Sequence, residues 1–171
     1  MRSLDCRSAI LVTGMSGTGK STALEALGHR TVDTDDPGWI VEVGTDHGGE
    51  PMWDLDRMSV LLSGHRQGWL FVSGCVTNQA SVYDRFDAVV LLSAPVDVIL
   101  SRVMDRANPF GSEPQHRAQI ASDVAEFEPR PRAGAGHEIV TTLPVDQVVV
   151  ALERIATYRA RNRPPNLLSE R

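Results

Sequence analysis

A glycine-rich loop between two apolar segments is the feature that most constrains how this chain can fold. Residues 14–22 read GMSGTGKST, after the apolar run AILVT at 9–13 and before ALEAL at 23–27. The first run is typical of a buried strand and the second of a helix. Residues 14–21 match the pattern GxxxxGK[ST] at every fixed position, in the strand-to-helix context that the pattern requires. An ordinary glycine-rich turn would not reproduce both flanks as well, so the sequence predicts a phosphate-binding loop.

The residue types in this loop suit a nucleoside triphosphate with Mg²⁺, and we expect ATP. Glycines let backbone N–H groups approach phosphate oxygens closely, and the start of the helix adds positive potential. Lys20 is expected to reach the β- and γ-phosphates, and the Ser21 hydroxyl is expected to bind Mg²⁺. The expected nucleotide-binding residues of the loop are Gly14, Ser16, Gly17, Thr18, Gly19, Lys20, Ser21 and Thr22.

Short apolar runs alternate with helical patterns along the rest of the chain. Predicted strands cover 9–13, 31–34, 69–74, 88–94 and 138–142. Predicted helices cover 20–27, 52–67, 95–106, 114–127 and 144–158. Continuous apolar strands indicate a parallel sheet that is buried on both faces. The alternation predicts a three-layer α/β/α fold with a five-stranded, mainly parallel sheet, in a single domain over 1–160 that is followed by a polar tail at 161–171.

Composition narrows the class of protein. The formal net charge of −5 argues against binding a nucleic acid backbone. The N-terminal segment lacks the apolar core of a signal peptide, and no window approaches 18 apolar residues, so no membrane span is expected. Cys6, Cys75 and the scattered histidines show no metal-ligand spacing. A cytoplasmic protein is the expectation, with no nucleic acid or membrane partner and with homodimerisation left open.

Several segments together resemble the small P-loop kinases of the shikimate kinase, adenylate kinase and gluconate kinase group. The segments that carry the resemblance are GMSGTGKS, VDTDD, VVLLSAP, DVILSRVMDRANPFG and HEIVTTLPVDQVV. The resemblance covers nearly the whole chain. It implies a P-loop NTPase fold with a small lid at about 106–118, and an ATP- and Mg²⁺-dependent kinase that transfers the γ-phosphoryl group to a hydroxyl of a small molecule.

The resemblance also implies roles for two carboxylates after the second predicted strand. Asp33 matches the carboxylate that lies near Mg²⁺ and helps to activate the acceptor hydroxyl, so Ser21 and Asp33 are the expected metal ligands. Asp35 matches the carboxylate that hydrogen-bonds the acceptor. A carboxylate at a strand end beside the phosphate loop is well placed to take a proton from an attacking hydroxyl. The alternative is a solvated turn, since Asp-Pro-Gly at 36–38 is itself a turn signal.

Two further segments resemble nucleotide contacts of the group. Arg102 and Arg106 lie four residues apart on one helix face, where lid arginines would neutralise the transferring phosphate. We expect Arg106 on the γ-phosphate side, so the expected catalytic residues are Lys20, Asp33 and Arg106. The alternative is that these arginines only solvate the helix. Thr142 falls in the turn that resembles an adenine-binding segment, although capping the last helix would also explain it.

The acceptor side departs from the group's patterns. Ser-Gly-Cys at 73–75 replaces a glycine triplet of shikimate kinases, and Glu128 stands where their substrate-binding arginine would be, so shikimate is disfavoured. Ser73 also replaces an aspartate of adenylate kinases. Residues 33–56 are acidic, which favours a neutral or cationic acceptor such as a nucleoside, sugar, aminocyclitol or antibiotic. Besides Asp33 and Asp35, the expected acceptor-binding residues are Trp53, as a flat wall, and Asn78 and Arg85, as hydrogen-bonding groups.

Purely structural roles also remain open for this region, because acidic residues often lie in solvent-exposed loops and tryptophans often lie in the core. Two other functions are also open. One is a nucleoside monophosphate kinase, which would need arginines to clamp the phosphate of its acceptor. The other is a nucleotide-binding regulatory or switch protein that has no small acceptor.

Overall fold

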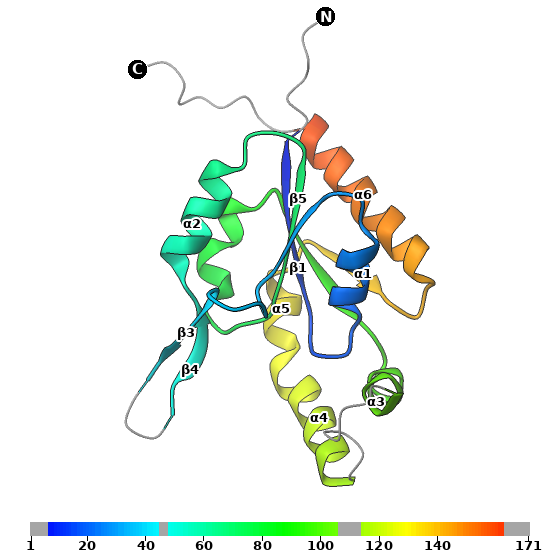
Figure 1. The fold of residues 1–171 in the computed structure, drawn as a ribbon. Coiled ribbons are helices and arrows are strands. Elements are labelled where there is room, and N and C mark those ends of the chain that lie inside the picture. The colour runs from blue at the N-terminus through cyan, green and yellow to red at the C-terminus, as the bar shows by residue number, and fades with distance from the viewer. Residues whose placement is uncertain (1–6, 45–47, 106–113, 163–171) are drawn as a thin grey trace, which may run out of the picture.

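The computed structural model describes residues 7–44, 48–105 and 114–162, and a five-stranded sheet forms its centre (Figure 1). The sheet order is β2 (Arg30–Asp33), β5 (Trp69–Ser73), β1 (Ser8–Thr13), β6 (Ala88–Ser93) and β7 (His137–Val140). Every neighbouring pair in this sheet is parallel. All five strands that the apolar runs predict are present, and the predicted α/β class is confirmed.

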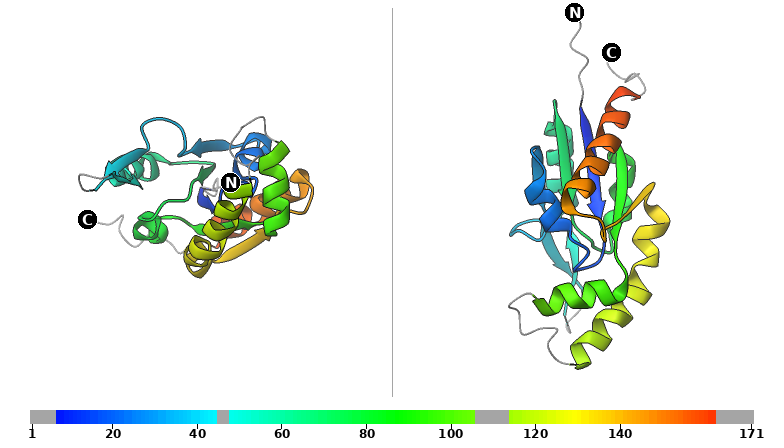
Figure 2. Two further views of the ribbon diagram at one scale, coloured as in Figure 1. Left: turned by 90° about the horizontal axis from the view of Figure 1, so that it is seen from below. Right: turned by 90° about the vertical axis from the view of Figure 1, so that its right-hand side faces the viewer.

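Helices cover both faces of the sheet and complete the three layers (Figures 1 and 2). The helical elements are α1 (Lys20–Ala26), α2 (Leu55–Gly64), the 3₁₀ helix η1 (Gln79–Arg85), α3 (Val96–Asp105), α4 (Pro114–Phe127), α5 (Pro129–Gly134) and α6 (Val145–Arg161). None of the helices in the described ranges is both long enough and apolar enough to cross a membrane.

Alternation along the central strands divides the core into two halves. Ile10 of β1 packs with Leu24 of α1 and Leu152 of α6 on one face of the sheet. Leu11, the next residue, packs with Met58 of α2 on the other face. Each such fully buried side chain contributes about 2 kcal/mol to stability. Because both faces are covered, these strands are apolar at every position rather than at alternate ones.

A two-stranded antiparallel hairpin was not expected from the sequence. It consists of β3 (Ile40–Val43) and β4 (Glu50–Trp53), with Ile40 opposite Trp53. β4 takes the first two residues of the predicted helix 52–67. That helix begins at Leu55 instead, because the Asp54 side chain caps it by accepting a hydrogen bond from Arg57 N over 3.0 Å. Figure 1 shows the hairpin below α2, projecting away from the five-stranded sheet.

The helices α3 and α4 lie beyond the carboxyl edge of the sheet, at the bottom of Figure 1. The predicted lid at about 106–118 falls partly on α4, since residues 114–118 form the start of that helix. Residues 106–113 lie outside the described residues, and so does the predicted catalytic residue Arg106. The tail predicted at 161–171 overlaps the end of α6, and residues 163–171 are also outside the described ranges.

Candidate functional site

The loop between β1 and α1 turns tightly at the carboxyl edge of the sheet. Gly14 and Gly17 have φ values of 149° and 83°, a region that disfavours residues with a side chain. A Cβ atom at Gly14 would lie 2.2 Å from the carbonyl oxygen of Leu92 on β6, and one at Gly17 would lie 3.0 Å from Ile99 Cγ2 on α3. The glycine pattern read from the sequence therefore reflects both backbone conformation and close packing against neighbouring elements.

Gly14→Ala is expected to lower the free energy of unfolding by about 2 kcal/mol or more, because the loop must move away from β6 to admit a methyl group. Nucleotide affinity should fall with it. Gly28→Ala is the matched control, since a Cβ there meets nothing within 4 Å. Thermal unfolding and equilibrium dialysis with Mg·ATP measure both effects. Equal stability of the two variants would contradict this account of the loop.

The side chains of the loop converge on its backbone. Lys20 Nζ donates hydrogen bonds to the carbonyl oxygens of Gly14 and Met15, over 2.7 and 3.0 Å. The Thr18 hydroxyl also donates to Met15 O, over 2.8 Å. Ser16 is exposed at the turn of the loop. The ammonium group of Lys20 therefore lies against the loop, where a bound phosphate would compete with the two carbonyl oxygens for it.

Ser21 and Asp33 place a hydroxyl and a carboxylate side by side next to the loop. The Ser21 hydroxyl donates to Asp33 Oδ2 over 3.0 Å. Asp33 ends β2 in register with Ser73 of β5. Phe71 packs with α1, so alternation along β5 places Ser73 on the face that α1 covers. The Ser73 hydroxyl is fully buried and has no hydrogen-bond partner among the described residues.

The Ser21 and Asp33 oxygens fit a hydrated Mg²⁺ ion. Mg²⁺ prefers hard oxygen ligands and retains several waters, so it needs only one or two protein ligands beside phosphate oxygens. Within the described ranges, no group of three or more His, Cys, Asp or Glu side chains is arranged to hold a metal. The ion would therefore depend on Ser21 and Asp33. The two predicted ligands are in contact, and their binding of Mg²⁺ stays a prediction.

A pocket of about 330 Å³ opens on the other side of α1. Its lining residues are Gly19, Thr22, Ala23, Arg102, Asp105, Thr141, Leu143, Val145 and Val148. Arg102 donates to Thr141 Oγ1 over 2.9 Å, to Thr141 O and to Gly17 O over 3.3 Å. The guanidinium group is thereby held against the phosphate loop. Apolar walls next to a phosphate loop suit a nucleoside, so this pocket continues the expected nucleotide site.

The nucleotide contact at Thr142 stays a prediction, because its side chain does not line this pocket but its neighbour Thr141 does. Thr142 is exposed and is not among the residues that line the pocket, whereas Thr141 is buried and its hydroxyl donates to Thr18 O over 2.7 Å. The predicted capping role of Thr142 is wrong, since α6 begins after Pro144 with no side-chain cap. Sequence spacing identified the turn, but it did not show which of two adjacent threonines points inward.

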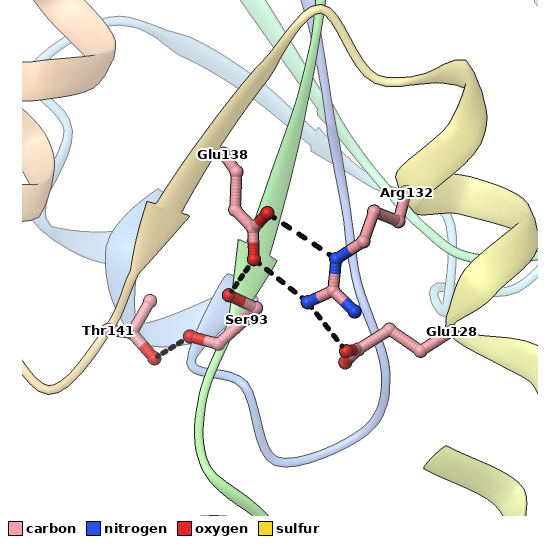
Figure 3. A network of polar contacts seen from close by, with 5 residues as sticks. All are labelled: Ser93, Glu128, Arg132, Glu138 and Thr141. Carbon is pink, nitrogen blue, oxygen red and sulfur yellow. Dashed lines mark hydrogen bonds and ion pairs between the residues drawn. The ribbon is translucent and has the colours of Figure 1, made fainter. Parts of the chain in front are cut away.

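A polar network connects α5 to this end of the sheet (Figure 3). Arg132 of α5 forms ion pairs with Glu128 and Glu138, each over 2.9 Å. The Ser93 hydroxyl donates to Glu138 Oε1 over 2.6 Å, and the Thr141 hydroxyl lies 3.2 Å from Ser93 O. Glu128 replaces the arginine that binds the acid substrate in shikimate kinases. Here its side chain is buried and paired with Arg132, and it is not among the lining residues of the nearby pocket.

The ion pair between Arg132 and Glu138 predicts a dependence of stability on pH. Hydrogen bonding to Arg132 lowers the pKa of Glu138 from its ordinary value of 4.5. The folded protein therefore binds this proton less readily than the unfolded chain does. The stabilisation is complete above pH 4.5 and is lost as the pH falls through the lowered pKa. The effect is modest, because the Glu138 side chain is 39% exposed.

Arg132→Gln should flatten this decline in the free energy of unfolding as the pH falls below the ordinary glutamate pKa of 4.5. At pH 7 it should cost about 1–3 kcal/mol, because Glu128 is left buried without its partner. Arg130→Gln on the same helix is the matched control, as Arg130 lies over the Phe127 ring instead. Urea unfolding at a series of pH values measures both. Identical pH profiles for Arg132→Gln and the unmodified chain would refute the assignment.

Two hollows adjoin the phosphate loop on the expected acceptor side. One, of about 390 Å³, is lined by Ser21, Leu24, Glu25, Thr31, Val32, Asp33, Asp36 and Trp39. The other, of about 350 Å³, we call the Met15 pocket. It is lined by Met15, Glu50, Pro51, Cys75, Val76, Thr77, Gln79, Ala80, Tyr83, Phe127, Arg130 and Pro131. The two hollows flank the strand ends that carry Asp33 and Ser73.

Three of the predicted acceptor-binding residues have structural roles instead. Trp53 is 1% exposed and its indole N–H donates to Thr34 Oγ1 over 2.9 Å, so its ring belongs to the core. The Asn78 amide bonds the backbone of Trp53 through both its oxygen and its nitrogen, over 2.9 and 3.0 Å. Arg85 ends η1, where the chain has returned to the amino edge of the sheet, and it donates to Ser59 Oγ. That edge is opposite the phosphate loop.

Asp35 does lie beside the site. It is exposed, and its backbone N–H donates to Asp33 Oδ1 over 3.1 Å. Trp39 lines the hollow that contains Asp33, and the Arg57 guanidinium lies 4.3 Å from the centre of its ring. The sequence reasoning did not select Met15 or Phe127 as pocket residues. Met15 occupies a variable position of the loop motif, and Phe127 ends a polar helix, so neither carried a distinguishing signal.

Comparison with known proteins agrees with this geometry. A family model described as an AAA domain matches residues 10–121, which is more than half of the chain. A protein of Paraburkholderia phymatum (strain DSM 17167 / CIP 108236 / LMG 21445 / STM815), named nucleotide-binding protein, is 29% identical over 147 residues. The match covers 78% of this chain and 48% of that protein, so the chain spans about half the length of this relative.

Solved structures of small kinases share the fold. Shikimate kinase from Acinetobacter baumannii in complex with shikimate superposes with a TM-score of 0.58 at 19% identity, covering 95% of this chain and 99% of that one. Shikimate kinase from Bacteroides thetaiotaomicron superposes with a TM-score of 0.58 at 16% identity, covering 86% and 97%. Identities this low show a common fold and leave the substrate open. The chain therefore belongs to the AAA domain family, and it has the P-loop fold of the small kinases.

Proposed function

We propose that this chain is an ATP- and Mg²⁺-dependent kinase that phosphorylates a hydroxyl group of a small molecule. The observation that carries the proposal is the contact between Ser21 and Asp33, whose oxygens lie 3.0 Å apart beside the phosphate loop. One side chain suits the metal of a bound triphosphate, and the other is a carboxylate that lines a hollow with room for an acceptor.

In this proposal each residue of the site has a separate role in phosphoryl transfer. Loop amides and Lys20 would hold the phosphates, and Ser21 and Asp33 would hold Mg²⁺, which would supply positive charge to neutralise the phosphates. Asp33 also accepts the proton of the attacking hydroxyl. Arg102 is held at the nucleoside side by Thr141. Arg106 stays a proposed partner of the γ-phosphate, since it lies outside the described residues.

Two other functions compete with this one. A nucleoside monophosphate kinase would need several cations around its second phosphate. The Met15 pocket has one arginine, Arg130, and the other hollow has no Lys or Arg among its lining residues. A nucleotide-binding regulatory protein is the stronger rival, because the Paraburkholderia relative carries the name nucleotide-binding protein.

A screen for ADP release separates these functions. The protein is incubated with Mg·ATP and a library of nucleosides, sugars, cyclitols, simple alcohols, aminoglycosides and nucleoside monophosphates. Stimulation by an alcohol, absent without Mg²⁺ and absent in Lys20→Ala, is the expected result. Stimulation by a nucleoside monophosphate alone would favour the first rival. Slow hydrolysis that no small molecule changes would favour the second.

A further inference from the structure

We propose that the phosphate acceptor is an uncharged ring compound less polar than a sugar, bound in the Met15 pocket with the Tyr83 hydroxyl as its hydrogen-bond donor. This inference rests on the proposed kinase function and narrows its substrate. It replaces the expectation that the acidic stretch at 33–56 selects the acceptor by charge.

The walls of the Met15 pocket are mostly apolar. Its apolar lining side chains are Met15, Pro51, Val76, Ala80, Phe127 and Pro131. A ring with bare carbon faces gains free energy by leaving water here. A sugar, with a hydroxyl on nearly every carbon, would bury several of these hydroxyls against the apolar side chains, at a cost of about 1–3 kcal/mol for each one left without a partner.

The charged residues at this pocket do not favour an ion. Glu50 and Arg130 are both exposed, and they carry opposite charges. The Arg130 guanidinium lies 5.9 Å from the centre of the Phe127 ring, an arrangement that directs it over an aromatic face. A phosphate or carboxylate would meet only this one cation, and an amine would meet only the one carboxylate. An uncharged ligand fits this balance best.

The Tyr83 hydroxyl is free to donate a hydrogen bond to a ligand in the pocket, because Gln79 bonds only its oxygen. Gln79 is 4% exposed, and its amide oxygen accepts from Thr13 Oγ1 and Val76 N. These bonds orient the Gln79 amide nitrogen, which donates to Tyr83 Oη over 2.7 Å. Because the phenol oxygen already accepts a bond, its own proton is left to donate. Burial raises the pKa of Tyr83 above 10.0, so the phenol is neutral at pH 7.

The tyrosine ring is also fixed in place. A Cβ atom at Gly134 would lie 2.2 Å from Tyr83 Cε2, so the ring packs directly against the backbone of α5. The hydroxyl is therefore positioned by two elements, η1 through Gln79 and α5 through Gly134. A donor held this firmly loses little conformational entropy when it binds a ligand.

The pocket lies beside the phosphate-transfer groups. Met15 lines it and belongs to the phosphate loop, where its carbonyl oxygen accepts from Lys20 Nζ over 3.0 Å. Cys75 follows Gly74, whose backbone N–H donates to Val12 O of β1 over 3.2 Å. The pocket therefore opens over the carboxyl ends of β1 and β5. Asp33 leaves the next strand, β2, in register with Ser73 at the end of β5.

Cys75 provides a direct test, because it is exposed and lines the pocket. The sequence contains two cysteines, so Cys6→Ser leaves Cys75 as the sole thiol of the full chain. The rate of its alkylation by iodoacetamide is measured with Mg·ADP and either cyclohexane-1,4-diol or myo-inositol at equal concentration. These probes share one ring and differ in hydroxyl number. The diol should slow alkylation at least about threefold, and myo-inositol should leave it unchanged.

Tyr83→Phe in the same background should raise the diol concentration needed for half-protection about tenfold, the worth of one hydrogen bond. Tyr158→Phe is the matched control, since Tyr158 is 61% exposed on α6. Equal protection by both probes, stronger protection by myo-inositol, or protection by neither would overturn the inference. Unchanged protection in Tyr83→Phe would remove Tyr83 from it. Protection by the diol without phosphorylation of any alcohol would support the pocket's ligand class and refute the kinase function.

Discussion

Lys20→Ala is expected to reduce ATP-dependent turnover at least about 100-fold. The Lys20 ammonium group lies against the loop, bonded to the carbonyl oxygens of Gly14 and Met15. With nucleotide bound, this point charge would neutralise charge on the transferring phosphate, which no other loop side chain can do. The fold should survive, because the lysine is only half-buried, so the melting temperature should change by no more than a few degrees.

The sequence allows this prediction to be checked chemically as well as by mutation. Lys20 is the only lysine among the 171 residues. An amine-reactive reagent therefore has one side-chain target, and peptide mapping separates it from the terminal amine. Mg·ATP should protect Lys20 from the reagent. Near-normal turnover in Lys20→Ala, or labelling that Mg·ATP does not change, would show that the loop does not act on a triphosphate.

Asp33→Asn is expected to lower kcat about 100-fold while changing the affinity for ATP little. Asparagine retains an oxygen that can accept from Ser21, but it can neither take the proton of an attacking hydroxyl nor offer a charged ligand to Mg²⁺. The affinity for ATP should persist, because the loop amides and Lys20 provide most of it. Steady-state kinetics over a range of Mg²⁺ concentrations measures kcat and the metal requirement together.

Asp56→Asn is the control for this change. Asp56 belongs to the same acidic stretch but is exposed on the first turn of α2. It should leave kcat within about twofold, as expected for a surface charge. If both variants lost activity equally, the general acidity of the stretch would matter rather than the position of Asp33. An unchanged kcat in Asp33→Asn would remove it from the role of base.

The strands and the phosphate loop could be predicted because each requires particular residue types at neighbouring positions in the sequence. Strands buried on both faces must be apolar at each position, so β1 and β6 are visible as continuous runs. The loop needs glycine where φ is positive or where a neighbouring backbone approaches, as at Gly14. The packing partners, such as Leu92 at Gly14, lie far along the chain. Each feature nevertheless leaves its own pattern of residue types at neighbouring positions, and that pattern is sufficient to identify it.

The hairpin β3–β4 could not be predicted in the same way. β3 and β4 are short, and most of their residues are exposed or half-exposed, so they have no clear alternation. Tertiary contacts hold the hairpin in place. Trp53 inserts into the core and bonds Thr34, and Asn78 bonds the backbone of Trp53 from a segment 25 residues later. The same contacts explain why Trp53 and Asn78 do not face an acceptor, although the sequence suggested that they would.

Part of the candidate site could also be predicted from the sequence, and part could not. Residues within the loop motif, and Asp33 at a strand end, were predictable because parallel strands bring their carboxyl ends to one edge. The walls of the Met15 pocket could not be predicted, because the residues that line it come from elements far apart in the chain. Tyr83 acquires its position from Gln79 and Gly134, and these contacts exist only in the folded chain.

The central claim is that the γ-phosphoryl group passes from ATP to an alcohol at this site. Phosphorus-31 NMR of Mg·ATP incubated with the protein and the alcohols that stimulate ADP release follows that group directly. The account predicts a phosphomonoester resonance that grows in step with ADP and is absent with Lys20→Ala. If ADP appeared only together with inorganic phosphate, the γ-phosphoryl group would be passing to water, and the kinase assignment would be wrong.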